Sequence, residues 1–224
     1  MSGRVRRIGA GIACFLLGGR EGWVLVDTGP AMARGRLIDG LRKTGWSEQD
    51  RLTVVVTHGD TDHIGSCAYL QRAFSAAIAV HPLEAQTAES GDMNANRKKR
   101  PDRLPWYFRA LMPLGRLFGA AESFAPDVLL EDGDRLSAYG IDAAVLHLPG
   151  HSKGSIGVLT DSGDLFCGDL FWNVRRPRLH PLLDDLEAAR NSVERLRDLP
   201  IETVHPAHGR SFAGSKLSEL IPSQ

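Results

Sequence analysis

The most constraining feature of this sequence is a dense group of acids and imidazoles directly after an apolar stretch. Residues 52–56 read Leu-Thr-Val-Val-Val, a short β-branched run that predicts a buried strand. Residues 57–63 then read Thr-His-Gly-Asp-Thr-Asp-His. Such a group is costly at the end of a hydrophobic strand unless its members are paired or bind a metal. Imidazole and carboxylate donors suit Zn²⁺, Fe or Mn, so the run predicts a metal site; the alternative is a polar turn that caps the next helix.

Three further candidate ligands also follow predicted strands. His151 comes after the apolar run 143–148, Asp169 follows 165–167, and His208 follows the last predicted strand. Residues at the ends of several strands can converge on one edge of a layered sheet structure. Each of the three is a weak signal when taken singly. The other histidines of this half are expected to pack or to lie at the surface: His147, His180 and His205.

The first 80 residues alternate between predicted strands and helices. Residues 8–17 and 23–26 are expected to form a hairpin around a Gly-rich turn. A helix is expected at about 32–43, a second at 64–76, and a strand at 77–80. Strand, helix and strand in this order predict βαβ units with parallel strands.

The second half returns to the same alternation. A helix is expected at 183–196, with Asp184 and Asp185 in its first turn and basic residues near its end, as the helix dipole favours. Short strands are expected at 128–130, 143–148, 155–159, 165–167 and 202–205.

Between the halves, at about 92–120, lies a segment that interrupts the alternation. Its basic run, residues 97–100, is expected to be a solvated loop. Its aromatic stretch, 104–118, predicts either a core-packing helix or a lid over an active site, and both interpretations stay open. With a lid, Trp106 and Phe108 are the candidate substrate contacts. The expectation is one domain over 1–224 that carries this segment as an insertion.

Five motifs in this chain resemble, in the same order, those of the metallo-β-lactamase superfamily. They are Asp27-Thr28-Gly29, His58-x-Asp60-x-Asp62-His63, Pro149-Gly150-His151-Ser152-x-Gly154-Ser155, Gly168-Asp169 and Pro206-x-His208-Gly209. The resemblance extends from about residue 8 to 212. It implies an α+β fold, a four-layer αββα sandwich of two mixed sheets with helices outside and metals at one edge.

The resemblance also implies a site for two divalent metal ions. One ion would be held by His58, Asp60 and His151, the other by Asp62, His63 and His208, with Asp169 between them. Zn²⁺ is favoured. The family typically has a second histidine where Asp60 stands, and the harder oxygen donor moves the first site toward Fe or Mn, or leaves it weak or empty. Asp27 would support the metal loop from behind.

The function implied is a metal-dependent hydrolase. A metal-bound hydroxide, oriented by Asp62, would cleave a small ester, lactone or thioester. One alternative is a diiron redox enzyme, similar to oxygen or nitric oxide reductases, that needs a separate electron donor. Others are a β-lactamase and a metal-free binding module. The Asp-Thr-Gly run also resembles an aspartic protease signature, but that chemistry needs two such acids and the chain has one copy.

Composition limits the partners. Lys plus Arg and Asp plus Glu number 27 each, so charge gives no case for nucleic acid or an anionic membrane, and a small-molecule substrate is expected. No apolar run is long enough to span a membrane. Three dispersed cysteines indicate buried thiols in a reducing compartment, and the protein is expected to be cytoplasmic. A dimer is common for such folds, but nothing in the sequence requires one.

Overall fold

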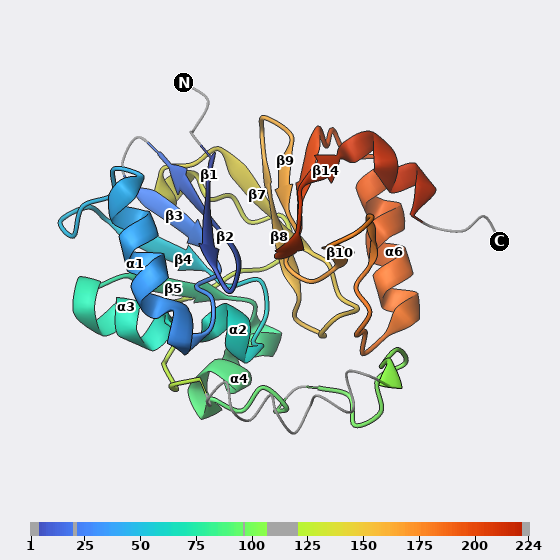
Figure 1. The fold of residues 1–224 in the computed structure, drawn as a ribbon, viewed down its shortest axis with the longest axis horizontal. Helices are drawn as coiled ribbons and strands as arrows, with labels where there is room; N and C mark the ends of the chain where they lie inside the picture. Colours follow the sequence, from blue (N-terminus) through green and yellow to red (C-terminus); the bar gives the residue numbers. More distant parts are fainter. Residues whose placement is uncertain (1–4, 20–21, 96, 107–120, 221–224) are drawn as a thin grey trace.

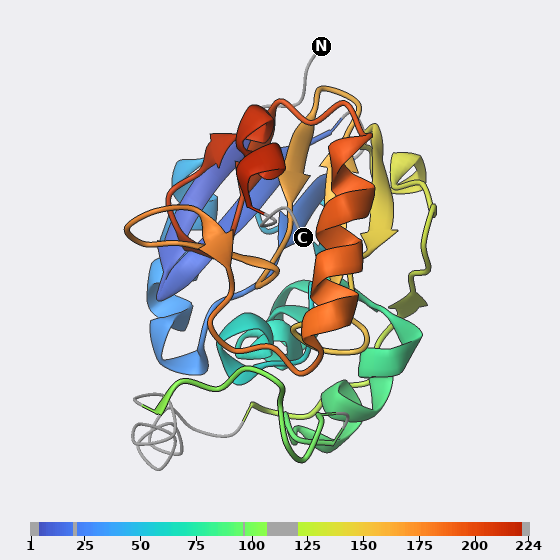
Figure 2. The same ribbon diagram turned by 90° about the vertical axis from the view of Figure 1, so that its right-hand side faces the viewer.

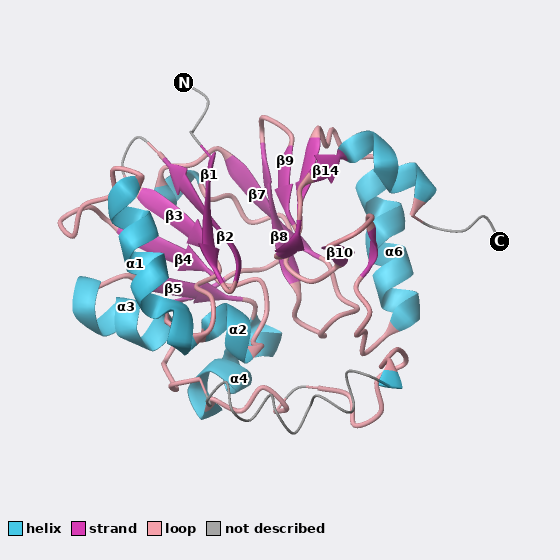
Figure 3. Cartoon of the chain, in the orientation of Figure 1, coloured by secondary structure: helices cyan, strands magenta, loops and turns pink. Residues whose placement is uncertain are grey.

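The computed structural model describes residues 5–19, 22–95, 97–106 and 121–220. Two β-sheets lie face to face between helices (Figure 1 and Figure 3). The first sheet has the strand order β1-β2-β3-β4-β5-β6. Its strands are β1 (Val5–Ala10), β2 (Ile12–Gly18), β3 (Trp23–Val26), β4 (Leu52–Val55), β5 (Ala77–Val80) and β6 (Val128–Leu129). Neighbours are antiparallel from β1 to β3 and parallel from β3 to β6.

The second sheet has the order β14-β12-β9-β8-β7, and a small third sheet has the order β11-β10-β13. The strands of the second sheet are β7 (Ala143–His147), β8 (Ile156–Thr160), β9 (Asp164–Phe166), β12 (Thr203–His205) and β14 (Phe212–Ala213). Those of the third are β10 (Phe171–Asn173), β11 (Arg178–Leu179) and β13 (His208–Gly209). Both large sheets are mixed, because β9 and β12 are parallel while β7, β8 and β9 are antiparallel.

Helices cover the outer face of each large sheet. The α-helices whose bounds fall within the described residues are α1 (Arg34–Lys43), α2 (Thr61–Ile64), α3 (Cys67–Phe74), α4 (Ala85–Ser90) and α6 (Leu186–Arg197). Short 3₁₀ helices lie at Ala31–Ala33, Pro82–Glu84, Ser137–Tyr139 and Gly214–Glu219. Helices α1 and α3 lie outside the first sheet, and α6 lies outside the second (Figure 1 and Figure 2). None of the helices in the described part of the chain is both long and apolar enough to cross a bilayer.

Strand β2 contributes side chains to two different hydrophobic cores. Because side chains alternate between the two faces of a strand, Phe15 and Leu17 join the core between the sheets, while Cys14 and Leu16 join the core beneath α1 and α3. A third core lies between the second sheet and α6. Three cores separating four layers confirm the expected αββα sandwich.

Three local expectations were wrong. The helix expected at 64–76 spans only Cys67–Phe74, because Ile64 ends the separate turn α2. The run 8–17 is not one strand: Gly11 has a φ of +88° and turns the chain, so β1 and β2 pair with Ala10 opposite Ile12. The last long helix begins at Leu186 rather than 183. Asp185 is its N-cap and accepts a hydrogen bond from the Ala188 amide, which leaves Asp184 before the helix.

Candidate metal centre

All seven predicted ligands lie at one edge of the sandwich, because they follow strands that end there. His58 and Asp60 lie in the loop after β4, and Asp62 and His63 lie on the single turn α2. His151 lies in the loop between β7 and β8, Asp169 follows β9, and His208 begins β13. The four segments meet although they are far apart in the sequence.

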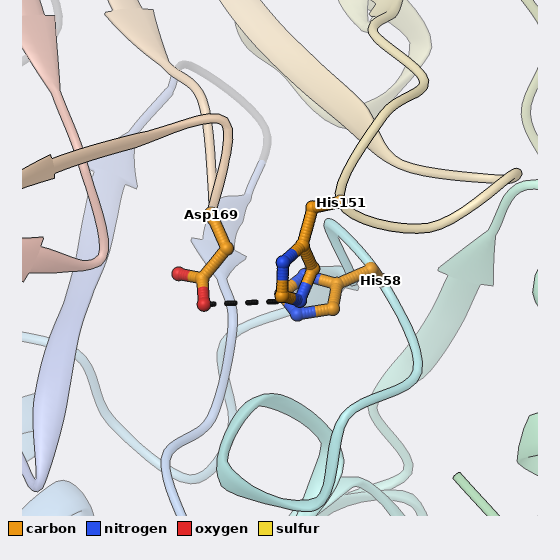
Figure 4. Close-up of side chains that lie close together, drawn as sticks. All are labelled: His58, His151 and Asp169. Atoms are coloured by element: carbon orange, nitrogen blue, oxygen red, sulfur yellow. Dashed lines mark ion pairs between the residues drawn. The ribbon is translucent and has the colours of Figure 1, made fainter. Parts of the chain in front are cut away.

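The ligand atoms form two neighbouring groups. Those of His58, His151 and Asp169 all lie within 4.8 Å of one another, and so do those of Asp62, His63 and His208. Figure 4 shows the first group, with the three side chains pointing toward one another. A metal ion bound by nitrogen and oxygen at about 2.0–2.2 Å takes its ligands from such a compact group of donor atoms.

Asp60 faces the first group. Its Oδ2 lies 3.0 Å from His151 Nε2 and 3.6 Å from His58 Nε2. Its Oδ1 contacts Arg97 Nη1 at 3.1 Å. One carboxylate oxygen is therefore directed at the predicted ligands, and the other at a cation.

Asp169 lies between the groups. Its carboxylate oxygens are 3.4 Å from His208 Nε2, 3.5 Å from His63 Nε2 and 3.9 Å from His151 Nε2. The side chain is 5% exposed. This is the position from which one carboxylate can contact two ions.

His180, which sequence reasoning set aside, lies inside the same cluster. It is buried, and its Nε2 is 3.3 Å from Asp169 Oδ2. Together with Asp169 and His208 it makes a third group of close ligand atoms. Its Nδ1 lies 3.0 Å from the Leu182 carbonyl oxygen, which also accepts from His151 Nδ1 at 2.9 Å. His180 lacks any local motif, so only its fold position reveals it. His147 and His205 lie elsewhere: His205 contacts Asp164 at 2.8 Å and stacks on Phe166.

Asp27 lies directly behind the metal loop. It is 2% exposed, and its carboxylate accepts hydrogen bonds from the Thr57 amide at 2.8 Å, the Thr57 hydroxyl at 2.8 Å and His63 Nδ1 at 2.9 Å. Donation from Nδ1 leaves the lone pair of His63 Nε2 directed at the cluster.

Two further residues with little solvent exposure hold the loops together, and the sequence did not predict either role. Glu84 accepts hydrogen bonds from the Gly59 amide, the Ser152 hydroxyl and the Gly154 amide, so it links the loops that carry His58 and His151. Arg97 was expected in a solvated loop, but its side chain is only 12% exposed. It differs from the expectation because two buried acids, Asp60 and Asp184, surround it. Lys98, Lys99 and Arg100 are exposed, as expected.

The electrostatics of the cluster are strongly coupled. Burial alone would raise the pKa of Asp60, but the charge of Arg97, a hydrogen bond from His151 and the nearby His58 imidazole hold it well below its usual value. Burial would lower the pKa of His208, but Asp169 and Asp62 raise it to about 10. The pKa of His63 is likewise raised well above normal, because the acids Asp27, Asp169 and Asp62 outweigh its burial. Burial lowers the pKa of His58 and takes that of His180 to about 3.

These residues fit a metal. Within the described residues, three buried atoms that face the cluster make no hydrogen bond: His58 Nε2, His63 Nε2 and Asp169 Oδ1. A buried polar atom without a partner costs about 1–3 kcal/mol, and coordination of a cation would remove that cost. Imidazole and carboxylate donors are the ones that Zn²⁺, Fe and Mn accept.

Only one of the two predicted substrate contacts lies within the described residues. Trp106 is 79% exposed, so its side chain does not lie in a core. Phe108 lies outside the described residues.

Cys14, Cys67 and Cys167 are all buried and free, as expected. Burial raises the pKa of Cys67 to about 12.

Comparisons with known proteins show the family. The family model of the metallo-beta-lactamase superfamily matches residues 8–208. The chain is 27% identical to the acyl-coenzyme A thioesterase MBLAC2 of Homo sapiens, over 92% of this chain and 76% of that protein. It is 28% identical to a hydroxyacylglutathione hydrolase of Vibrio campbellii, over 67% of this chain and 44% of that enzyme.

Solved structures show the same fold. The protein TTHA1623, in a di-iron-bound form, is 28% identical, with a TM-score of 0.71 and coverage of 98% of both chains. The Rm3 metallo-beta-lactamase is 23% identical, with a TM-score of 0.70 and coverage of 92% of this chain and 76% of its own, a likeness of fold alone. The chain therefore belongs to the metallo-β-lactamase superfamily, and it is a metallo-hydrolase of that superfamily.

Proposed function

We propose that this enzyme is a two-metal thioester hydrolase. The observation that carries the proposal is the convergence of two ligand groups that share Asp169 at one edge of the sandwich. The sequence alone left esters, lactones and thioesters open. Two sets of relatives with different acyl carriers, coenzyme A and glutathione, are named as thioester hydrolases, which favours the thioester.

The proposed ligands divide the cluster into two sites. His58, Asp60 and His151 would hold one ion and Asp62, His63 and His208 the other, with Asp169 between them. Two bound cations would activate water for attack on the thioester carbonyl and stabilise the charge that develops there. In the net reaction the C–S bond breaks, water supplies the oxygen of the new carboxylate, and the thiol leaves with a proton.

Asp62 is the proposed catalytic residue. Its side chain is 39% exposed, against 13% for Asp60 and 5% for Asp169, so among these acids it is the one that solvent reaches most readily. Its Oδ2 lies 3.4 Å from His208 Nε2. Its exposure supports the proposal that Asp62 accepts a hydrogen bond from the attacking water and orients it.

Metal identity is a separate question from substrate. A set of ligands rich in imidazole suits Zn²⁺, whereas Asp60 adds an oxygen donor and a similar protein has been crystallised with two irons. The elemental analysis that accompanies the assay therefore includes zinc, iron and manganese. Two irons with a visible absorption band would move the assignment to the redox alternative.

The proposal is tested with a substrate panel. Metal-loaded protein is given an acyl-coenzyme A, an acyl-glutathione, an aryl ester, a lactone and a β-lactam, with thiol release or ring opening followed by absorbance. We expect the two thioesters to be cleaved with the highest kcat/KM, and Asp62→Ala to lose turnover while keeping its fold. Asp164→Asn, which changes an acid outside the cluster, is the matched control. Faster cleavage of the lactone, ester or β-lactam, or full turnover by metal-loaded Asp62→Ala, would overturn the assignment.

A further inference from the structure

Arg97 forms a fork between two buried acids. Its Nη1 lies 3.1 Å from Asp60 Oδ1, and its Nε lies 3.2 Å from Asp184 Oδ2. The three side chains are 12%, 13% and 5% exposed. A guanidinium is planar with donors in fixed directions, so contact with two carboxylates at once fixes its plane.

Backbone hydrogen bonds hold this fork in place. The segment that carries Arg97 pairs with the loop before α6: the Arg103 amide donates to the Leu183 carbonyl at 3.1 Å, and the Leu183 amide donates to the Arg103 carbonyl at 2.9 Å. The Lys98 amide donates to Asp184 Oδ2 at 3.0 Å. The same loop supplies the Leu182 carbonyl that orients His151. The placement of Arg97 is therefore tied to the geometry of the first ligand group.

The two oxygens of Asp60 are divided between two tasks. Oδ1 contacts Arg97, while Oδ2 faces the Nε2 atoms of His151 and His58 at 3.0 and 3.6 Å. With Oδ1 directed at Arg97, Oδ2 is the oxygen that Asp60 presents to the first site. An aspartate also brings one negative charge that an imidazole would not, and the adjacent guanidinium offsets it.

We propose that Arg97 is a positioning residue that makes Asp60 a single-oxygen, charge-compensated ligand of the first metal site. The inference rests on the proposed two-metal site and goes beyond it. It explains how a carboxylate serves where the superfamily typically has a neutral imidazole, and it gives the segment at 97–103 a structural role beside the candidate metal site. Loss of such a partner behind a ligand typically lowers metal affinity by about 10–100-fold.

The test is metal binding rather than turnover. Zinc affinity and stoichiometry are measured by chelator competition for the wild type, Arg97→Met and Arg97→Lys. Arg100→Met, in the same basic run but exposed, is the matched control. We expect two ions in the wild type, and in Arg97→Met one ion held as before and one weakened by about 10–100-fold. Arg97→Lys keeps the charge but loses the fork, so its loss should be intermediate. Thermal unfolding checks that each variant is folded.

A double variant guards against a merely structural effect. Asp60→His combined with Arg97→Met supplies a neutral ligand that needs no cation, so we expect it to regain the second ion. Two ions at wild-type affinity in Arg97→Met, tighter binding in that variant, or no recovery in the double variant would overturn the inference. A wild type that holds fewer than two ions overturns both this inference and the proposed site. Correct metal behaviour without thioester cleavage overturns the proposed function alone.

Discussion

Replacing Asp27 by Asn should weaken metal binding without unfolding the protein. In the wild type the Asp27 carboxylate accepts from His63 Nδ1 at 2.9 Å, which keeps the lone pair on Nε2. An Asn of the same shape can present its NH₂ group to Nδ1. The imidazole then carries its proton on Nε2, the atom that faces Asp169 and Asp62 at 3.5 and 4.0 Å. A protonated nitrogen cannot bind a metal.

The magnitude follows from the contacts. Loss of a partner behind a ligand lowers metal affinity by about 10–100-fold, which corresponds to about 1.4–2.7 kcal/mol. The backbone should be undisturbed, because Asp27 has a φ of +60° and Asn adopts that left-handed region as readily as Asp does. The remaining acceptor oxygen can still take a hydrogen bond from Thr57, so the metal-free protein should lose only about 1–3 kcal/mol of stability.

The assay is competition with a chromophoric chelator, with thermal unfolding of the metal-free protein in parallel. Asp164→Asn is the control, because Asp164 holds the distant His205 at 2.8 Å by a comparable contact. If Asp27→Asn binds both ions as tightly as the wild type, or if Asp164→Asn loses affinity to the same extent, Asp27 does not keep His63 Nε2 available for metal binding.

Three further predictions follow from the described side chains. Metal uptake at neutral pH should release protons, because the pKa of His208, raised to about 10 by Asp169 and Asp62, keeps that imidazole protonated in the metal-free protein and a bound ion displaces the proton. Affinity should therefore rise with pH. Calorimetry in buffers of different ionisation enthalpy measures the release, and a heat independent of buffer would contradict it. Glu84→Gln should lower the melting temperature by about 2–4 °C for each kcal/mol lost, because an amide cannot accept all three hydrogen bonds that Glu84 receives; an unchanged melting temperature would count against its linking role. Trp106→Ser should raise KM for long-chain acyl thioesters more than for short ones if the exposed side chain contacts substrate, and an equal KM for both would remove Trp106 from the proposed substrate contacts.

The sequence predicted the parts of this molecule that local patterns encode. The β-branched run before His58 and the apolar run 12–17 predict buried strands, and the motifs after several strands predict that the seven candidate ligands meet at one edge. The turn at Gly11 was missed because the apolar pattern continues through it, and only the left-handed backbone reveals the break.

The missed residues depend on contacts between distant parts of the chain. Arg97 meets Asp60 across 37 positions, and Glu84 meets Ser152 across 68. His180 reaches the cluster only because the segment after β11 folds back over Asp169. In the sequence, Arg97 is one of four consecutive basic residues, and composition gives no reason to separate it from its exposed neighbours.

Metal titration of thioester hydrolysis shows whether the enzyme needs two bound ions. Protein freed of metal by chelation is given zinc in steps, and thiol release from an acyl-coenzyme A is recorded at each step. We expect no turnover without metal and full turnover at about two equivalents, as for a two-metal site. Turnover in the metal-free protein, full turnover at one equivalent, or no turnover at two would contradict it.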